Sequence, residues 1–224
     1  MIAQKLPRLQ GLTTDIVIFT IENEGLKTLL IRRANEPFKG NWALPGGFIL
    51  EKEGSRDAAL RVLRDKAGVK NVYLEQLYTF DDSGRDPRGQ VCTITYFALV
   101  PRYKIKFEDG KNIQTPSLFS LDKLPKLAFD HKLIVSYALK RLQAKLEYTN
   151  AVYSLLPNEF TFNELQSAYE VILGKKLDKR NFRKKFLLLG LIKAMSKKYS
   201  GKRQRPARLF HFVNRKPTEL KKFF

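Results

Sequence analysis

Residues 61–69, RVLRDKAGV, have the length, polarity and closing glycine of a helix that holds a divalent metal ion through acidic side chains. Hard cations such as Mg²⁺ bind carboxylate oxygens, and acids spaced three or four residues apart project from one helix face. Here Val62 and Lys66 stand at two positions where such a helix would carry acids, and Asp65 stands at a third. Asp65 is therefore the one possible carboxylate ligand among these three positions, and the segment by itself predicts at most an incomplete metal site.

The segments around this helix predict an α/β domain. Residues 14–21 and 27–33 are β-branched or aliphatic runs separated by ENEG, which predicts a hairpin. Residues 72–80 and 91–100 predict two more strands around a polar loop, DDSGRDPRGQ. Strands alternating with helices in this order indicate a mixed sheet with helices on its faces.

Two amphipathic helices are predicted to cover the sheet. The first has Ser55 as its N-cap and Gly68 just beyond its end, where a left-handed backbone is least costly without a Cβ. Its predicted apolar stripe is Ala59, Leu60, Leu63 and Ala67. The second helix is predicted over residues 129–148, so the first domain is expected to span residues 1–148.

Charge is distributed unevenly along the chain. Lys and Arg total 42 against 22 Asp and Glu, a formal net charge of +20. Residues 151–224 hold 18 of the basic residues and only 5 of the acidic ones. This asymmetry favours a polyanionic partner, nucleic acid before membrane, for a second domain over residues 149–224.

The pattern of this second domain predicts a winged helix-turn-helix. Thr161 and Glu164 have the spacing of a capping box, in which each side chain bonds the other's backbone amide. A second helix begins after Asp178 and ends near Gly190. Two short strands are then expected around a basic loop, residues 197–205.

The second of these helices has the two faces of a recognition helix. Phe182, Phe186 and Leu189 fall on one side and are expected to pack inward, while Arg180 and Lys184 point the opposite way. Such a helix fits the major groove of DNA, and a basic wing suits phosphate or minor-groove contact. The residues predicted to contact DNA are Lys179, Arg180, Asn181, Arg183, Lys184, Lys197, Lys198, Lys202, Arg203 and Arg205.

Residues 47–69 resemble the Nudix box, G-x5-E-x7-R-E-U-x-E-E-x-G-U, where U is aliphatic. The positions in register are Gly47, Glu53, Arg61, Leu63, Gly68 and Val69. Nudix enzymes hydrolyse a diphosphate linked to another moiety with Mg²⁺ or Mn²⁺, and the resemblance implies an α/β/α sandwich with a mixed sheet. The family's three Glu positions after the Arg read Val62, Asp65 and Lys66.

These substitutions predict a site without a metal and without a catalytic residue. Valine offers no lone pair, and Lys66 places a positive charge where the cation would sit. At an effective dielectric of about 20, two like charges ~4 Å apart cost about 4 kcal/mol, and a divalent ion doubles this. Two alternatives stay open: Arg61 and Asp65 form only a surface ion pair, or Glu51, Glu53 and Asp65 support residual hydrolysis.

A pocket without metal can still hold phosphate groups through guanidinium side chains. Arg32, Arg85 and Arg88 are the predicted effector-binding residues, and GRDPRGQ resembles a loop of ADP-ribose-directed Nudix proteins. The aromatic side chains Phe38, Trp42 and Phe80 are either stacking partners for adenine or part of the core.

The order of the two domains resembles the Nudix-related transcriptional regulators of the NrtR family. The resemblance covers nearly all of residues 10–213, with LEYTNAVYSLLPNEFTFNELQSAYEVILGKKLDKRNFRKKFLLLGLI and RPARLFHF as its most distinctive parts. It implies a homodimeric repressor of bacterial NAD biosynthesis or salvage genes, joined through its Nudix domains. It also implies ADP-ribose as the effector that releases double-stranded operator DNA, with no cofactor required; related regulators sense sugars such as arabinose.

Two other functions remain as alternatives. One is an active hydrolase of ADP-ribose or another nucleoside diphosphate derivative, against which Val62 and Lys66 argue. The other is an RNA-binding module, which would usually display exposed aromatic side chains for stacking on bases.

No run of about 18 apolar residues appears, so no membrane span is expected. A single cysteine, Cys92, permits no internal disulfide, and the protein is expected to be cytoplasmic.

Overall fold

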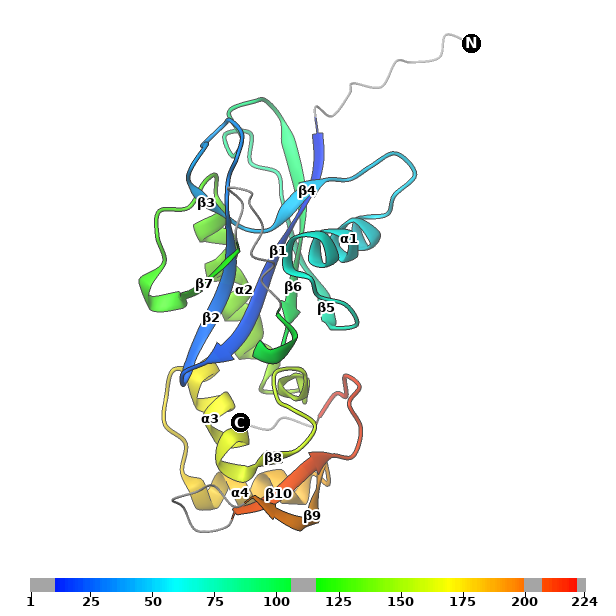
Figure 1. Cartoon of the computed structure of the whole chain (residues 1–224), viewed down its shortest axis with the longest axis vertical. Helices are drawn as coiled ribbons and strands as arrows, with labels where there is room; N and C mark the ends of the chain where they lie inside the picture. The colour runs from blue at the N-terminus through cyan, green and yellow to red at the C-terminus, as the bar shows by residue number, and fades with distance from the viewer. Residues whose placement is uncertain (1–10, 106–115, 200–206, 221–224) are drawn as a thin grey trace.

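The computed structural model describes residues 11–105, 116–199 and 207–220. Figure 1 shows two domains arranged end to end, with the mixed sheet in the upper part and the helices and short strands of the C-terminal part below it. Within the described ranges, none of the helices combines the length and apolar character that crossing a membrane requires.

The sheet of the first domain is mixed, as predicted. Its main path runs β3-β2-β1-β6-β5, with β4 paired to β1 and β7 paired to β2. The two long central strands β1 and β6 are parallel, whereas the other pairs are antiparallel. The strands are β1 (Gly11–Glu22), β2 (Gly25–Arg32), β3 (Trp42–Ala43), β4 (Gly46–Phe48), β5 (Tyr73–Phe80), β6 (Val91–Leu99) and β7 (Ser117–Ser120).

Apolar residues along β1 alternate between the two faces of the sheet, as the period of a strand requires. Ile16 and Ile18 belong to the core on one face, which the helix α1 (Ser55–Ala67) covers. Val17 and Phe19 belong to the core on the other face, under α2 (His131–Lys145). The predicted α/β/α sandwich is therefore confirmed, and Figure 1 shows the two helices on opposite sides of the sheet.

Two details of α1 differ from the prediction. Gly54 is the N-cap, and the Ser55 hydroxyl instead lies 2.9 Å from the hydroxyl of Tyr96. Leu60 is exposed, and the buried stripe is Ala58, Ala59, Val62, Leu63 and Ala67. Gly68 ends the helix with φ of 62°, in the left-handed conformation that was expected.

The second domain contains the predicted helix, helix and hairpin. Helix α3 (Phe162–Leu173) begins with the capping box of Thr161 and Glu164, and α4 (Lys179–Leu188) begins after Asp178, whose side chain accepts from the Asn181 amide. The strands β8 (Phe160–Thr161), β9 (Ile192–Tyr199) and β10 (Ala207–Phe212) form a sheet in the order β8-β10-β9. This is a winged helix-turn-helix arrangement with one additional short strand, β8.

A continuous apolar core joins the two domains. It extends from Phe97 and Leu142 in the first domain to Tyr169 and Phe186 in the second. Between them, the 3₁₀ turn η3 (Ala151–Ser154) is buried. Two further 3₁₀ turns, η1 (Arg102–Lys104) and η2 (Leu121–Lys123), lie in the first domain.

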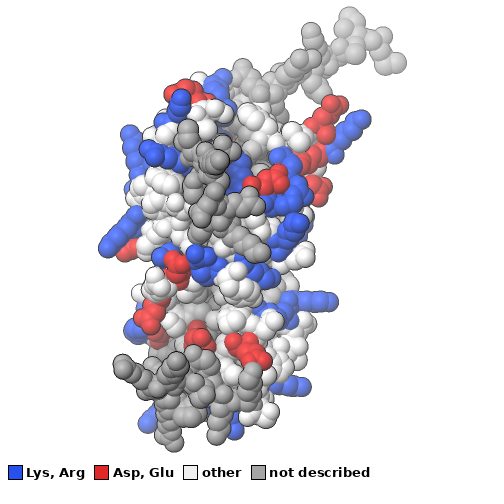
Figure 2. Space-filling view, viewed as in Figure 1, with Lys and Arg blue, Asp and Glu red and all other residues white. Residues whose placement is uncertain are grey.

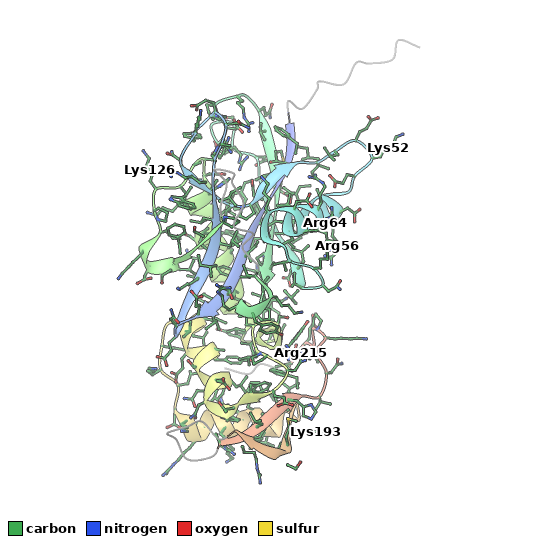
Figure 3. All side chains as sticks on the ribbon, viewed as in Figure 1. Lys52, Arg56, Arg64, Lys126, Lys193 and Arg215 are labelled. Carbon is green, nitrogen blue, oxygen red and sulfur yellow. The ribbon has the colours of Figure 1, made fainter. Side chains whose placement is uncertain are left out.

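Residues 214–220, which follow β10, return to this junction. Leu220 donates its amide to the Tyr148 carbonyl at 2.7 Å, and Asn150 bonds the backbone of Thr218. Arg215, labelled at the junction in Figure 3, donates to the carbonyls of Tyr153, Leu156 and Pro157 at 2.6–2.9 Å. The end of the wing is therefore tied to the end of α2 by hydrogen bonds.

Candidate effector pocket and nucleic-acid interface

A cavity of about 130 Å³ lies where β1, β4, α1 and the start of α2 meet. Its lining includes two of the three predicted effector-binding residues, Arg85 and Arg88, together with Arg33 and the Nudix-box position Lys66. Arg32 does not line it: this side chain is exposed, and its Nε donates to the Gly40 carbonyl at 3.0 Å. Of the two adjacent arginines at the end of β2, the second one therefore faces the cavity.

The buried part of the cavity is an ion-pair network built around Arg85. Its Nε and Nη2 donate to the two carboxylate oxygens of Asp130 at 3.0 and 2.8 Å, and Nη2 lies 3.7 Å from Asp15. The Arg85 side chain is only 3% exposed. This arrangement favours a role in joining loop 81–90 to the first turn of α2, and direct contact with phosphate stays a prediction.

Asp15 and His131 complete this network. Thr93 donates its hydroxyl to Asp15 at 2.8 Å, and His131 Nε2 lies 3.7 Å from the other oxygen of Asp15. His131 Nδ1 accepts from the Leu44 amide at 2.9 Å, so the proton of the neutral ring is on Nε2. Burial lowers the pKa of His131, which keeps the ring neutral at pH 7.

Gly46 permits the close approach of β4 to this carboxylate. A Cβ at Gly46 would lie 2.0 Å from Oδ1 of Asp15 and 2.7 Å from the Thr14 carbonyl oxygen. Both distances are far below van der Waals contact, so the position accepts only glycine. The absence of a side chain at Gly46 is therefore what lets Asp15 occupy its place in the cavity wall.

Cationic and aromatic side chains alternate at the rim of the cavity. The Arg33 guanidinium lies 4.7 Å from the centre of the Phe129 ring, and that of Arg88 lies 5.4 Å from Phe48 and 5.8 Å from Phe129. Arg88 also holds Asp86 through two hydrogen bonds of 3.0 and 2.6 Å. The rim offers positive charge and flat apolar surface together, which suits a phosphorylated ligand that also carries a ring.

The aromatic residues considered as adenine partners are placed differently. Phe38 packs edge-on against Phe129 with ring centres 4.9 Å apart, next to the cavity. Trp42 packs on Phe119, and Phe80 packs on Tyr78 and Tyr137. The structure therefore favours the core interpretation for Trp42 and Phe80, and it brings Phe129 and Phe48 to the rim in their place.

The acidic positions of the Nudix-like helix do not form a metal site. Glu53 is held by Arg61 through two bonds of 2.7 Å, which lower the pKa of Glu53 to about 2. Val62 is buried in the core, and Asp65 pairs with Arg64 at 3.0 Å. The alternative of an Arg61–Asp65 pair is wrong, since Glu53 takes Arg61. Among the described residues, no group of three or more His, Cys, Asp or Glu side chains could hold a metal ion.

The recognition helix presents the two predicted faces. Phe182 and Phe186 are buried with Leu189 packed beside them, whereas the predicted DNA-contacting residues of α4 are exposed: Lys179, Arg180, Asn181, Arg183 and Lys184. Five basic residues and no acidic residue lie within α4. One of them, Arg183, stacks on Phe162 at 4.9 Å, which fixes its guanidinium beside the helix.

The wing is described only in part. Lys197 and Lys198 belong to β9, which pairs with β10, while Lys202, Arg203 and Arg205 lie outside the described residues. The hairpin has two further exposed basic residues, Lys193 on β9 and Arg208 on β10, which were not among the predicted DNA-contacting residues. Figure 3 labels Lys193 at the lower end of the molecule, and in Figure 2 basic side chains project from the margins of that half.

A larger cavity of about 620 Å³ lies at the domain junction, away from the network around Asp15. It is lined by Arg56 of α1, Lys145 of α2 and Arg215 of the returning segment. Lys145 pairs with Glu75 at 2.9 Å, and Arg56 donates to the Leu74 carbonyl at 3.3 Å. None of the predicted effector-binding residues lines this cavity.

Comparison with known proteins assigns both domains. Residues 11–138 match the NUDIX domain model, and residues 152–212 match the model of the NrtR DNA-binding winged helix domain. The chain belongs to the NrtR family. A relative named the ADPR responsive transcriptional repressor NtrR of Acinetobacter baylyi is 40% identical to this NrtR-family protein over 207 residues, which cover 90% of this chain and 82% of the relative.

Solved structures agree with this assignment. Shewanella oneidensis NrtR in complex with a 27mer DNA is 36% identical, covers 90% of this NrtR-family chain and 93% of its own, and superposes with a TM-score of 0.79. The NUDIX domain of the same protein with ADP ribose is 38% identical over 60% of this chain and 90% of its own, with a TM-score of 0.54. An ADP-ribose pyrophosphatase of Methanocaldococcus jannaschii is 38% identical over 109 residues, which cover 49% of this chain and 63% of that enzyme.

Proposed function

We propose that this protein is a transcriptional repressor whose winged helix binds double-stranded operator DNA and whose Nudix-like domain binds ADP-ribose, which releases the DNA. The observation that carries the proposal is helix α4, which packs an aromatic face inward and presents five basic residues without an acidic one. A relative of the same two-domain plan is named an ADP-ribose-responsive repressor, and the DNA-bound relative has the same fold. The proposed regulated genes are those of NAD biosynthesis or salvage.

The DNA-binding part of this proposal is tested by fluorescence anisotropy on promoter fragments of the NAD genes of the same genome. The double variant Arg180→Ala/Lys184→Ala removes two outward groups of α4. It should weaken binding at least ~30-fold, since each charged contact is worth about 1–3 kcal/mol. A matched control is Lys132→Ala/Lys140→Ala, which removes two exposed charges of α2 and should change affinity less than about tenfold. Equal losses of DNA affinity in both variants would count against α4 as the recognition helix.

The effector part of the proposal is tested by adding ADP-ribose to the preformed complex. Release of labelled DNA by ADP-ribose, and not by arabinose, is the expected result. Release by arabinose alone would assign the protein to the sugar-responsive branch instead. The Arg180→Ala/Lys184→Ala variant should bind ADP-ribose like the wild type, because α4 is remote from the cavity around Asp15.

We also propose a homodimer. A dimer would place two recognition helices about 34 Å apart, one helical turn of DNA, on a pseudo-palindromic site. Sedimentation of the free protein and of its DNA complex measures the stoichiometry. One protomer per operator at saturation would contradict the dimer.

The similarity to the Methanocaldococcus enzyme supports a second candidate function, hydrolysis of ADP-ribose. The carboxylates that would support it are poorly placed, since Glu53 is held by Arg61 and Asp65 pairs with Arg64 outside the cavity. Incubation of the protein with ADP-ribose and Mg²⁺ or Mn²⁺, followed by chromatography for AMP, tests this candidate. Multiple turnovers per minute would favour the enzyme over the sensor.

A further inference from the structure

Lys66 lies at the position where the Nudix signature carries an acidic residue, and its side chain lines the effector cavity. Within the described residues it has no carboxylate within 4.0 Å, and burial lowers the pKa of its ammonium group. Desolvation of an unpaired cation is unfavourable, so the free protein keeps this charge in the cavity wall at a cost in stability.

Arg33 is the second cation of the cavity without an ion-pair partner among the described residues. It donates to the carbonyls of Pro37 and Asn35 only, and burial together with the nearby Arg88 lowers its pKa. The other two cations of the cavity are compensated, Arg85 by Asp130 and Arg88 by Asp86. Lys66 and Arg33 are therefore the two cations of the cavity without an ion pair among the described residues, and the Asp15 carboxylate, which also lines the cavity, compensates them only in part. The diphosphate of a nucleoside diphosphate ester carries two negative charges at pH 7 and could pair with both.

The donor set around Lys66 does not fit the divalent metal that the Nudix fold implies. Val62 has no donor atom, and its Cγ2 lies 3.8 Å from where a Cβ of Gly47 would be, in apolar contact with the turn. Glu53 is neutralised by Arg61, and Asp65 is exposed and does not line the cavity. A methyl group of Val62 therefore lies near the glycine turn where a ligand would be needed, and the cavity beside this turn is lined by the cationic Lys66.

We propose that the Lys66 ammonium takes the place of the divalent cation, so that the protein binds the diphosphate of its effector without metal. This inference rests on the proposed function and names the group that supplies the counter-charge. It also accounts for sensing without cleavage. A metal ion both neutralises phosphate charge and lowers the pKa of a bound water molecule, whereas a protonated lysine does only the first. The fixed charge further selects a diphosphate over a neutral sugar.

Isothermal titration with ADP-ribose in EDTA and in Mg²⁺ tests the inference on the full-length protein. The wild type should bind equally, within about twofold, in both buffers. Lys66→Gln should weaken binding roughly 10- to 100-fold in both, the range expected when a charge-assisted hydrogen bond is lost. Lys66→Arg keeps the charge and should stay within about fivefold of wild type. Lys70→Gln, an exposed lysine of the following turn that does not line the cavity, is the matched control and should bind like wild type.

The outcomes separate this inference from the proposed function. Wild-type binding that needs Mg²⁺ would overturn the role of Lys66 and leave ADP-ribose as the effector. Unchanged affinity of Lys66→Gln would do the same. Failure of the wild type to bind ADP-ribose in either buffer would overturn both. Thermal unfolding of each variant checks the fold, and Lys66→Arg supports the charge argument even if Lys66→Gln is unstable.

Discussion

The Arg85–Asp130 pair is expected to determine the stability of the first domain. Arg85 is 3% exposed and donates two hydrogen bonds to Asp130, whose side chain is 16% exposed. Removal of Arg85 leaves the half-buried Asp130 carboxylate without its counter-charge, and breaking a buried ion pair typically costs about 3–5 kcal/mol. The substitution Arg85→Met keeps most of the apolar length of the side chain, so its loss of stability reports mainly on the charge and the hydrogen bonds.

A loss of about 3–5 kcal/mol corresponds to a Tm decrease of roughly 6–20 °C for a chain of this size. Trp42 is the only tryptophan, and it packs on Phe119 while its carbonyl accepts from the Ala128 amide, close to the start of α2. Its fluorescence during urea or thermal unfolding therefore reports on the domain that contains the pair.

An exposed pair of the same chemistry serves as the control. Arg64 and Asp65 lie 3.0 Å apart with side chains 53% and 51% exposed, and Arg64→Met should cost less than about 1 kcal/mol. In a double-mutant cycle, Arg85→Met with Asp130→Asn should be less destabilised than the sum of the single variants by about 1–3 kcal/mol. A loss for Arg85→Met no larger than for Arg64→Met would refute the reasoning.

Further predictions follow from the same structure. Gly46→Ala should lower the Tm and ADP-ribose affinity together, because its Cβ would meet Asp15 at 2.0 Å; calorimetry measures both, and a variant like wild type would contradict the close approach. Burial lowers the pKa of His131 below its ordinary value of 6.5, so the unfolded chain binds the proton more readily, and stability should be constant above about pH 7 and fall as pH drops below about 6.5. This slope, measured by urea unfolding, should vanish in His131→Gln. Thr161→Ala removes the capping box that it shares with Glu164 and should destabilise the winged helix by about 1 kcal/mol; chemical denaturation followed by circular dichroism measures it. An increase of salt from about 50 to 200 mM should weaken operator binding ~10³-fold if about six phosphates are neutralised, whereas a flat response in anisotropy would argue against a basic interface.

Elements with local signals were predictable from the sequence. The long strands and the helices α1, α3 and α4 have clear periodicity, and the capping box and Gly68 marked helix ends correctly. The strands β3, β4, β7 and β8 have two to four residues each, too few for a period to emerge. Ser55 was a reasonable cap, but its hydroxyl bonds Tyr96, 41 residues away, and such a contact has no local signature.

The pocket residues were harder to predict than the fold. Arg32 and Arg33 are adjacent at the end of β2, and which of them faces the cavity depends on how the strand ends. The burial of Val62 could have been predicted from the sequence, because Val62 falls into the apolar spacing of α1 with Ala58, Ala59 and Leu63. The network of Asp15, Arg85, Asp130 and His131 joins three separate segments, so it emerges only from the tertiary structure.

The contacts of α2 suggest how the two proposed functions are linked. Its first turn receives Arg85 from loop 81–90, and near its end Gln143 donates to the Ile172 carbonyl of α3 at 2.9 Å. The segment after the wing also bonds residues 148–150, so the helix-turn-helix and the wing are both attached to the end of α2.

A ligand that moves loop 81–90 would therefore act on both parts of the DNA-binding domain through one rigid helix. Effector binding can change DNA affinity only by the difference in its affinity for the two arrangements, typically about 1–3 kcal/mol. We expect Gln143→Ala to leave ADP-ribose and DNA binding intact when each is measured alone, because neither interface contains Gln143. The factor by which ADP-ribose weakens DNA binding should shrink in this variant, and an unchanged factor would place the coupling outside the α2–α3 contact.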